Sequence, residues 1–388
     1  MYSDQLLLNV FDTEFNQIAV IDDYTSLIWT EKYQEVGDFE LELRYDKKWK
    51  DILKQDYYCR IDPSERTMII EKVQIEHDDD GLSVMTVSGR SVECILERRI
   101  VWKKRTFGTT TNSETGEETK VGVNVQDSIK TLFNDNIISP TNSMRKITNF
   151  KFTESTDSYI KTLLFNQDYD GDSMLNVIED LCSDKRIGYK ILMDDNNNFN
   201  FQFYKGIDRS MDQSTNEVVI FSENYDNLIS SEYYSDKSEY CNVLYVTKSN
   251  SGTGSSGSTK TEVYGEKQAP HGLDRRETTC SESDLQSKFK TSENKSISGN
   301  AMQTKGRIKL KKDYKIKEVM EGDISYESMF VYPDDYQVGD KVQFIDIYGN
   351  NRPMTVTEMV IGRDDSGYTM IPTFEDVEEG YDPDLDTE

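Results

Sequence analysis

Apolar and polar side chains alternate at every second position through most of residues 1–105, and this pattern restricts the fold more than any other feature. In DFELELRY, residues 38–45, the alternation places apolar side chains on one face of a strand and charged ones on the other. Asp80 and Gly81 separate two further alternating runs, which is typical of a hairpin turn. Repeated hairpins of this kind predict an antiparallel barrel or sandwich.

A mixed pattern replaces the alternation between residues 106 and 204. Residues 123–136 predict a short amphipathic helix, and residues 190–204 predict a hairpin with a polar Asp/Asn turn. A second helix is indicated by an apolar stripe at positions i, i+4, i+7 and i+8, formed by Met174, Ile178, Leu181 and Cys182. These features predict a compact α/β module inserted between stretches of β-structure.

Strands return after residue 205 and include the lysine-rich run RIKLKKDYKIK at 307–317. The fold class predicted is therefore mainly β with an α/β insert, α+β overall. The predicted units are a first β-barrel domain of residues 1–105 with about 205–235, the inserted domain at 106–204, a second β-barrel domain at 236–375 with a loop or helical insertion near 268–305, and an acidic tail at 376–388.

The charge balance, 45 Lys+Arg against 72 Asp+Glu, gives a net charge of −27. Since nucleic-acid affinity depends on cations that neutralise phosphates, specific nucleic-acid binding is disfavoured. The five cysteines include no C-x-x-C and are expected to be unpaired thiols. The sequence shows no secretory leader and no apolar run that would span a bilayer, so we expect synthesis in a cytoplasm and no stable membrane insertion.

Two motifs resemble ligand sites, and we expect neither to bind a cofactor. GTGSSG at 252–257 follows an apolar strand but precedes another β-like segment, so no helix N-terminus is available for a pyrophosphate. An EF-hand-like spacing offers a weak calcium site at Asp168, Asp170, Asp172 and Glu179. Gly171 falls at the fourth position of that loop instead of the sixth, and a helix N-cap role for Asp172 or Ser173 explains the same residues.

No catalytic arrangement is predicted, because the two histidines, His77 and His271, stand in polar, turn-like segments without a nucleophile motif.

Two clusters of basic residues occur in this otherwise acidic sequence, at 98–105 and 305–317. Such clusters either guard strand edges or form charge-complementary interfaces with protein partners.

A series of segments, in order along nearly the whole chain, resembles the siphovirus Gp37-like tail hub proteins, a family related in fold to the baseplate hub of contractile tails. These segments are SLIWTEKYQEVGDFELEL, VSGRSVECILERRIV, FYKGIDRS, GLDRRET, VGDKVQF and IPTF. The motif positions with an expected structural role are Trp29, Gly37, Phe39, Arg98, Arg99, Gly206, Asp208, Arg209, Gly272, Arg275 and Arg276.

The resemblance implies a homotrimeric ring of tail-tube-like barrels in a virion tail or phage-tail-like particle, with no catalytic residue. It implies as partners a tail tube or distal tail protein, a tape-measure protein, and a spike or tip protein, while DNA could pass through the lumen without specific binding. Two alternatives stay open at this point: a tail-associated cell-wall hydrolase, with the insert as its seat, and a carbohydrate-binding tip module.

Overall fold

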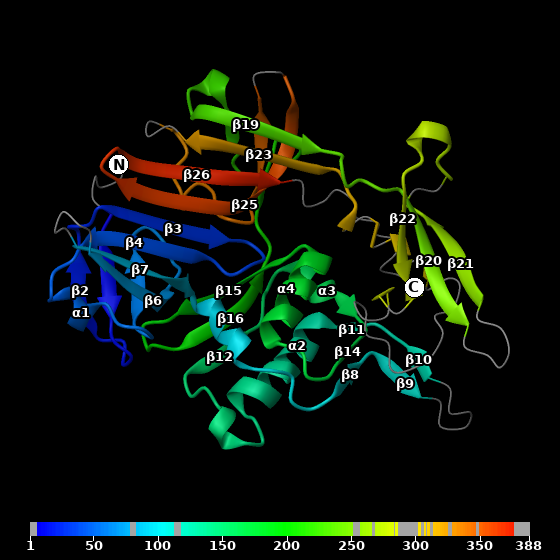
Figure 1. Ribbon diagram of the computed structural model, residues 1–388, viewed down its shortest axis with the longest axis horizontal. Coiled ribbons are helices and arrows are strands. Elements are labelled where there is room, and N and C mark those ends of the chain that lie inside the picture. The colour runs from blue at the N-terminus through cyan, green and yellow to red at the C-terminus, as the bar shows by residue number, and fades with distance from the viewer. Residues whose placement is uncertain are drawn as a thin grey trace.

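The computed structural model in Figure 1 describes most of the chain. The described residues are 6–77, 83–111, 118–250, 257–265, 268–282, 284–285, 302–303, 306–307, 309–310, 313–324, 328–346 and 349–375. The GTGSSG motif up to position 256, the predicted turn at Asp80 and Gly81, and the acidic tail lie outside them.

Strands from both ends of the chain form one 14-stranded sheet. In spatial order its main path runs through β19 (Leu228–Asp236), β23 (Lys317–Ile324), β26 (Gly367–Glu375), β25 (Asn351–Asp364), β3 (Ser26–Lys32), β4 (Asp38–Arg44), β7 (Ser83–Ser91), β6 (Met68–His77), β5 (Tyr58–Ile61), β1 (Leu8–Phe11) and β2 (Gln17–Ile21). Off this path, β24 (Lys341–Ile345) pairs with β25 and with β17 (Asp208–Arg209) and β18 (Ile220–Ser222).

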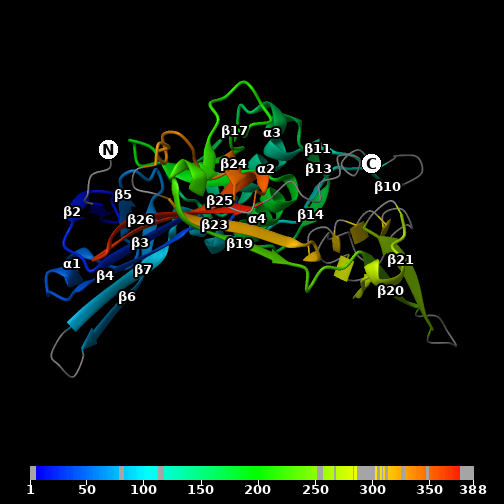
Figure 2. The same ribbon diagram turned by 90° about the horizontal axis from the view of Figure 1, so that it is seen from above.

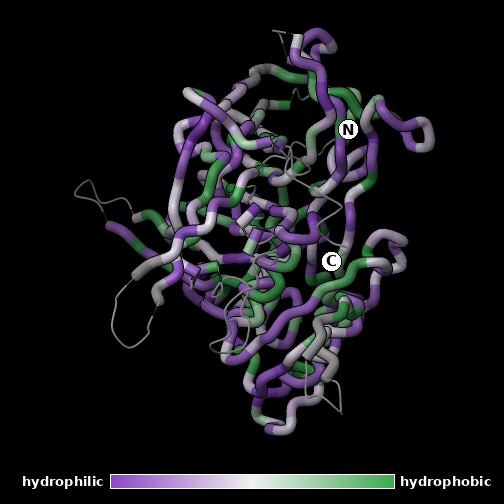
Figure 3. The backbone as a smooth tube through the Cα atoms, turned by 90° about the vertical axis from the view of Figure 1, so that its right-hand side faces the viewer, coloured by the Kyte–Doolittle hydropathy of each residue, from purple (hydrophilic) through white to green (hydrophobic). Residues whose placement is uncertain are grey.

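The alternation in the sequence accounts for the strands of this sheet. On β4 the side chains of Phe39, Leu41 and Leu43 are buried, whereas Asp38 and Glu40 between them are exposed. The hairpin predicted around residues 78–82 is confirmed by the antiparallel pairing of β6 with β7. Figure 3 shows the resulting separation, with apolar segments gathered inside and hydrophilic ones on the outer strands and loops.

The two predicted barrels are wrong as closed structures, because among the described residues no sheet closes on itself. The N-terminal and C-terminal strands instead join edge to edge where β3 pairs with β25, with Trp29 opposite Ile361. Both halves share one apolar core, in which Leu41 and Val87 belong to the same cluster as Phe344. A sheet continued through β3 and β25 leaves β2 and β19 as its two ends.

The segment of about 205–235, which the sequence grouped with 1–105, holds strands that pair with strands from the C-terminal third of the chain. β17 and β18 run parallel to β24, and β19 runs antiparallel to β23. The exact division of the chain into domains stays a prediction.

The α/β insert has its own core below the main sheet in Figure 1. Helices α2 (Val125–Phe133) and α4 (Met174–Lys185) match the two predicted helices, and the predicted hairpin is formed by β15 (Gly188–Met193) and β16 (Phe199–Tyr204). The remaining elements near or within the insert are η1 (Val92–Arg98), β8 (Arg105–Phe107), β9 (Thr109–Thr111), β10 (Glu118–Lys120), β11 (Val123–Asn124), η2 (Asn134–Ile138), η3 (Ser143–Arg145), β12 (Phe150–Thr153), α3 (Ser158–Thr162), β13 (Leu164–Phe165) and β14 (Gln167–Tyr169). Helix α1 (Trp49–Ile52) lies instead beside β2 at the far left of Figure 1.

Local signals fix the ends of the insert helices. Asn124 precedes α2, and its side chain accepts a hydrogen bond from the Asp127 amide at 3.2 Å, as an N-cap should. α4 ends at Lys185, and the next residue, Arg186, has a left-handed φ of 52° that stops the helix. The turn of the β15–β16 hairpin is held by Asp194, whose carboxylate accepts hydrogen bonds from the amides of Asn196 and Asn198.

A separate three-stranded sheet, called the third sheet below, stands apart at the right of Figure 1 and extends away from the body in Figure 2, at the opposite end from the β6–β7 hairpin. It consists of β21 (Gly257–Tyr264), β20 (Val243–Asn250) and β22 (Glu277–Ser281), near η5 (Gly272–Asp274), while η4 (Glu223–Tyr225) precedes β19. Since β21 directly follows the glycine-rich motif, that motif joins two antiparallel strands and leads into no helix.

In the lysine-rich run predicted as a strand, the described residues 307, 309, 310 and 313 are helical, residues 314–316 are neither helix nor strand, and only Lys317 belongs to a strand. Leu310 is buried in the small core of the third sheet beside Val263. Lys309 contacts Asp313 one turn later at 2.6 Å. Where it is described, the run therefore holds the buried Leu310 and a helical ion pair, and β23 begins only at its last residue, Lys317.

All five cysteines are free, as predicted, and within the described residues no helix is long and apolar enough to cross a membrane. Burial raises the pKa of Cys94 to about 12 and also raises the pKa values of Cys59, Cys182 and Cys280. Cys241 is the one cysteine that is partly exposed.

We therefore expect iodoacetamide to modify the native protein at Cys241 first, because the attacking species is an accessible thiolate. Intact-mass analysis over time should show one fast adduct, and peptide mapping should place it at Cys241. Addition of guanidinium chloride should release the other four thiols together. Fast labelling of Cys59 or Cys182 in the folded protein would contradict the packing described here.

Candidate functional site

The three parts of the chain meet around Tyr33, which directly follows β3. Its ring packs edge-to-face on Tyr204 at the end of β16, with the ring centroids 5.3 Å apart. Gly188 at the start of β15 and Gly339 before β24 lie against the same ring, and a Cβ atom at either position would overlap it. Gly339 also has a φ of 102°, which other residues rarely adopt. The N-terminal strands, the insert and the C-terminal strands thus close on one aromatic side chain.

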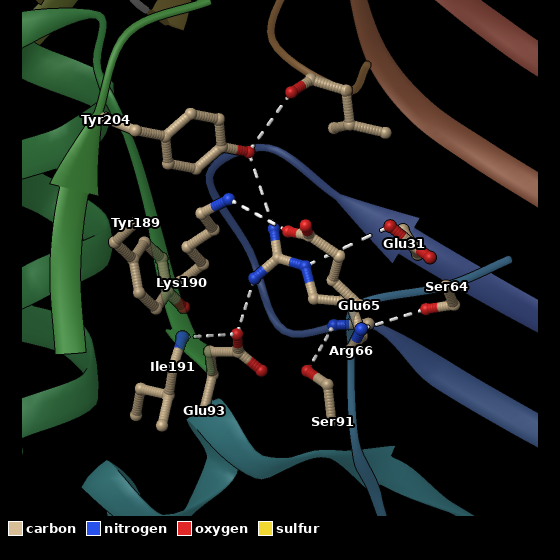
Figure 4. Close-up of polar contacts among 12 residues, drawn as sticks. Glu31, Ser64, Glu65, Arg66, Ser91, Glu93, Tyr189, Lys190, Ile191 and Tyr204 are labelled. Atoms are coloured by element: carbon tan, nitrogen blue, oxygen red, sulfur yellow. Dashed lines mark hydrogen bonds and ion pairs between the residues drawn. The ribbon is translucent and has the colours of Figure 1, made fainter. Parts of the chain in front are cut away.

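A buried arginine lies beside this contact (Figure 4). Arg66 is 6% exposed, and its guanidinium donates a hydrogen bond to Glu93 Oε1 at 2.6 Å and another to the Tyr204 hydroxyl at 3.4 Å. Glu31, at the end of β3, holds its Oε2 atom 4.0 Å from Arg66 Nε and accepts a hydrogen bond from the Tyr332 hydroxyl at 2.7 Å. Arg66, Glu31, Glu93, Tyr204 and Tyr332 are called the Arg66 network below.

The Arg66 network connects elements that are far apart in the sequence. Glu93 belongs to η1, and its Oε1 atom also accepts a hydrogen bond of 2.8 Å from the amide of Ile191 on β15. Tyr204 donates to the carbonyl of Val338 at 3.2 Å. Each carboxylate keeps one buried oxygen, Glu31 Oε1 and Glu93 Oε2, without a hydrogen-bond partner among the described residues. Hydrogen bonds therefore fix the positions of the network residues, but two of its buried carboxylate oxygens lack a hydrogen-bond partner among the described residues.

Opposing effects set the protonation of the network. Burial alone would lower the pKa of Arg66, but the neighbouring Glu93, Tyr204 and Glu31 raise it above its ordinary value. Burial also raises the pKa values of Tyr204 and Tyr332, so both hydroxyls stay protonated and can donate. One guanidinium thus stands between two carboxylates in a region shielded from water.

A second buried ion pair locks the C-terminal strands to the end of the insert. Asp340 accepts hydrogen bonds from Arg209 Nε at 3.0 Å, from the Ile207 amide at 2.7 Å and from the Gln337 amide at 3.1 Å. Burial raises the pKa of Asp340, and these hydrogen bonds oppose that rise. A Cβ atom at Gly206 would overlap the carbonyl oxygen of Gly339. The Gly-x-Asp-Arg motif of the sequence therefore positions this contact.

The other motif residues in the N-terminal strands pack the core. Trp29 is fully buried, donates to the Ser64 hydroxyl at 3.2 Å and packs on Phe39 with ring centroids 5.9 Å apart. Gly37 lies so close to the Thr30 carbonyl that no side chain fits, and its amide donates to the Ser91 hydroxyl at 3.0 Å.

With these positions explained by packing, comparison with known proteins decides the family. The family model described as "Siphovirus ReqiPepy6 Gp37-like protein" matches residues 7–374. The chain belongs to the siphovirus Gp37-like family.

Two solved structures share the fold of this Gp37-like chain. The 43 kDa tail protein of prophage MuSo2 from Shewanella oneidensis has a TM-score of 0.61 and 13% identity, with 97% of this chain and all of that chain covered. The tail protein from Neisseria meningitidis MC58 has a TM-score of 0.57 and 13% identity, with 96% and 97% covered. A search of curated proteins returned no match.

The remaining family-motif residues of the Gp37-like chain lie in two other places. At the base of the insert, Arg98 pairs with Asp56 at 3.5 Å, and Arg99 donates to the Arg145 carbonyl at 2.9 Å. In the third sheet, Gly272 turns the chain with a φ of 59°, and Arg275 pairs with Glu262 and Glu277. Arg276 donates to the Lys237 carbonyl at 2.9 Å.

Asp208 orders the segment after Gly206, because its carboxylate accepts hydrogen bonds from the amide and the hydroxyl of Ser210. The structure thus distributes the motif positions over the shared core, the junction around Tyr33, the base of the insert and the third sheet. They do not converge on one site.

The calcium candidates are not gathered around a common point. The Asp170 amide donates a hydrogen bond to the Asp172 carboxylate. Glu179 on α4 accepts a hydrogen bond from the Tyr189 hydroxyl at 3.3 Å, and burial raises the pKa of Glu179. Among the residues that the structure describes, no three His, Cys, Asp or Glu side chains are grouped closely enough to hold a metal ion. His77 contacts the Ser83 hydroxyl at 2.9 Å, and His271 immediately precedes η5.

Sequence reasoning missed the Arg66 network. One available signal was Glu31, which lies an even number of positions after Leu27 and Trp29 on the same strand and so points inward with them.

The cavity beside the network, lined by Glu31, Arg66, Lys190, Tyr204 and Tyr332 among others, measures about 30 Å³. That volume suits one or two water molecules and is far below the roughly 300 Å³ of a small-molecule site. The junction is therefore built to hold parts of the chain together.

Proposed function

We propose that this chain is a structural hub of a phage or phage-derived tail, and that three copies form a ring linking the tail tube to the distal tip or spike. The family match over residues 7–374 is the observation that carries the proposal. The fold shared with two prophage and bacterial tail proteins supports it. The partners proposed are a tail tube or distal tail protein, a tape-measure protein and a spike or tip protein.

The ends of the main sheet support the proposed ring. Among the described strands, β2 and β19 each pair with one neighbour only, so both are edge strands of the described sheet. On β2, Ile18 is 41% exposed and Val20 is 50% exposed. A closed homo-oligomer would cover such edges, because each copy supplies a partner for the next.

Deleting the gene from its parent phage or particle and imaging the tails tests the proposed role. We expect tails without a distal tip, or no tails, and recovery when the chain is supplied in trans. Normal tips in particles that lack the chain would overturn the proposal.

The exposed apolar residues of β2 give a specific prediction about assembly. Ile18→Lys with Val20→Lys should prevent ring formation, because lysines on a strand edge block pairing with another chain. Both side chains are about half exposed on an edge strand, so the free energy of unfolding should change by only about 0.5–1 kcal/mol. Sedimentation and thermal unfolding measure the two effects. Ile75→Lys, on the exposed face of β6 within the sheet, is the matched control, and unchanged ring formation in the double variant would contradict the use of this edge.

We also propose that the chain has no enzymatic activity. The motif residues that distinguish its sequence serve packing, turns and ion pairs, as the contacts of Trp29, Gly206 and Arg275 show. A zymogram with peptidoglycan distinguishes a chain without enzymatic activity from the alternative, a cell-wall hydrolase. We expect no clearing, and clearing by the purified chain would replace the hub proposal with an enzymatic one.

A further inference from the structure

An exposed apolar and basic patch centred on Trp102 lies on the insert, where the segment between η1 and β8 meets η3. Trp102 is 72% exposed and Met144 is 88% exposed, although large apolar side chains are usually buried. Arg145 connects them, since its guanidinium lies 5.6 Å from the Trp102 ring centroid and donates a hydrogen bond of 2.7 Å to the Ile100 carbonyl. Ile100, Trp102, Lys103, Met144 and Arg145 are called the Trp102 patch below.

The backbone under the Trp102 patch is held firmly in place. The Trp102 amide donates to Asn136 Oδ1 at 3.0 Å, and the Val101 amide donates to the Asp172 carbonyl at 2.8 Å. On the preceding side, Ile100 forms a β-bridge with Ser173. An aromatic side chain presented by a fixed backbone loses little freedom on binding, and exposed Trp and Arg together are typical of interaction hot spots.

The charge around the Trp102 patch is positive and uncompensated. Within the described part of the chain, Arg99, Lys103, Lys104, Arg145 and Lys146 form no ion pair with a carboxylate. Arg99 also donates to the Arg145 carbonyl at 2.9 Å; burial lowers the pKa of Arg99, and the charges of Arg145 and Arg98 lower it further. A patch of this kind on a chain of net charge −27 favours an acidic ligand.

The chain itself contains a segment of the required chemistry. After Arg363 the sequence has no Lys or Arg, and residues 376–388 hold seven carboxylates together with Val377, Tyr381 and Leu385. The segment follows directly on β26, which ends at Glu375. Thirteen extended residues reach up to about 45 Å from the end of β26.

We propose that the acidic C-terminal segment 376–388 docks on the Trp102 patch. Its carboxylates pair with Lys103, Lys104 and Arg145, and its apolar side chains cover Trp102 and Met144. Nucleic acid would meet the same cations, but the large negative charge of the chain opposes it. The docking does not depend on the tail role proposed above.

Carbodiimide crosslinking of the full-length protein tests this docking, because the reagent joins a lysine to a carboxylate in direct contact. Peptide mapping should recover links from Lys103 or Lys104 to residues 376–388, and few links from the exposed Lys47 and Lys50 to that segment. Trp102→Ala should reduce the Lys103 and Lys104 links by roughly tenfold or more. Met329→Ala, which removes another well-exposed side chain, is the matched control and should change nothing.

Two outcomes would overturn the proposal: equal yields at the reference lysines and at Lys103 and Lys104, or unchanged yields in the Trp102→Ala variant. Far-UV circular dichroism checks that the variants fold. Mixing chains labelled with ¹⁴N and ¹⁵N shows which copy supplies the segment. Links within one chain and links between two chains both support the docking.

Discussion

Replacing Arg66 by methionine should lower the free energy of unfolding by about 3–5 kcal/mol. The substitution keeps an unbranched apolar stem but leaves Glu31 and Glu93 buried without the guanidinium between them. It also removes a hydrogen-bond donor from the Tyr204 hydroxyl. Urea denaturation followed by near-UV and far-UV circular dichroism measures the loss.

A triple variant separates the cost of two unpaired charges from the loss of packing. Arg66→Met with Glu31→Gln and Glu93→Gln removes the charge of all three groups, and we expect most of the lost stability to return. Arg60→Met is the matched control, since its guanidinium donates to the Thr67 hydroxyl and is only partly buried. A loss below 1 kcal/mol in Arg66→Met, or no recovery in the triple variant, would show that the Arg66 network does not hold the junction.

Gly206→Ala should destabilise the protein by about 2–3 kcal/mol, because the new Cβ atom would overlap the backbone carbonyl of Gly339. Backbone cannot move aside as a flexible side chain can, and a shift there would also displace Asp340 from Arg209. Thermal unfolding measures the effect. The matched control is Gly265→Ala, where the nearest atoms would be 3.6 Å away or more and the change should be small. Equal stability of the two variants would refute the close approach.

Local sequence patterns predicted the elements of this fold well, and the physical reason is that each pattern reports on its own segment. The alternation in β4, the stripe on α4 and the Asp194 turn all correspond to structure within a few residues. The same kind of reasoning failed within 307–317, where residues 307, 309, 310 and 313 are helical and Leu310 is buried in the core of the third sheet.

Pairing between distant strands could not be predicted in the same way. Nothing in the alternation of β3 indicates that Trp29 lies opposite Ile361 on β25. The same alternation is equally compatible with N-terminal strands and C-terminal strands that each form a closed barrel. The Arg66 network was hidden for the same reason: Glu31, Arg66, Glu93 and Tyr332 carry no common spacing, and only the meeting of three parts of the chain brings them together.

The central claim is that three copies of this chain form a ring, and the mass of the intact protein in solution, together with a low-resolution image, tests it most directly. Three chains of 44.9 kDa give about 135 kDa, and the account predicts that mass and a central opening. The Ile18→Lys and Val20→Lys double variant should give the mass of one chain under the same conditions. A compact single chain at every concentration, including in the presence of neighbouring tail proteins, would contradict the account.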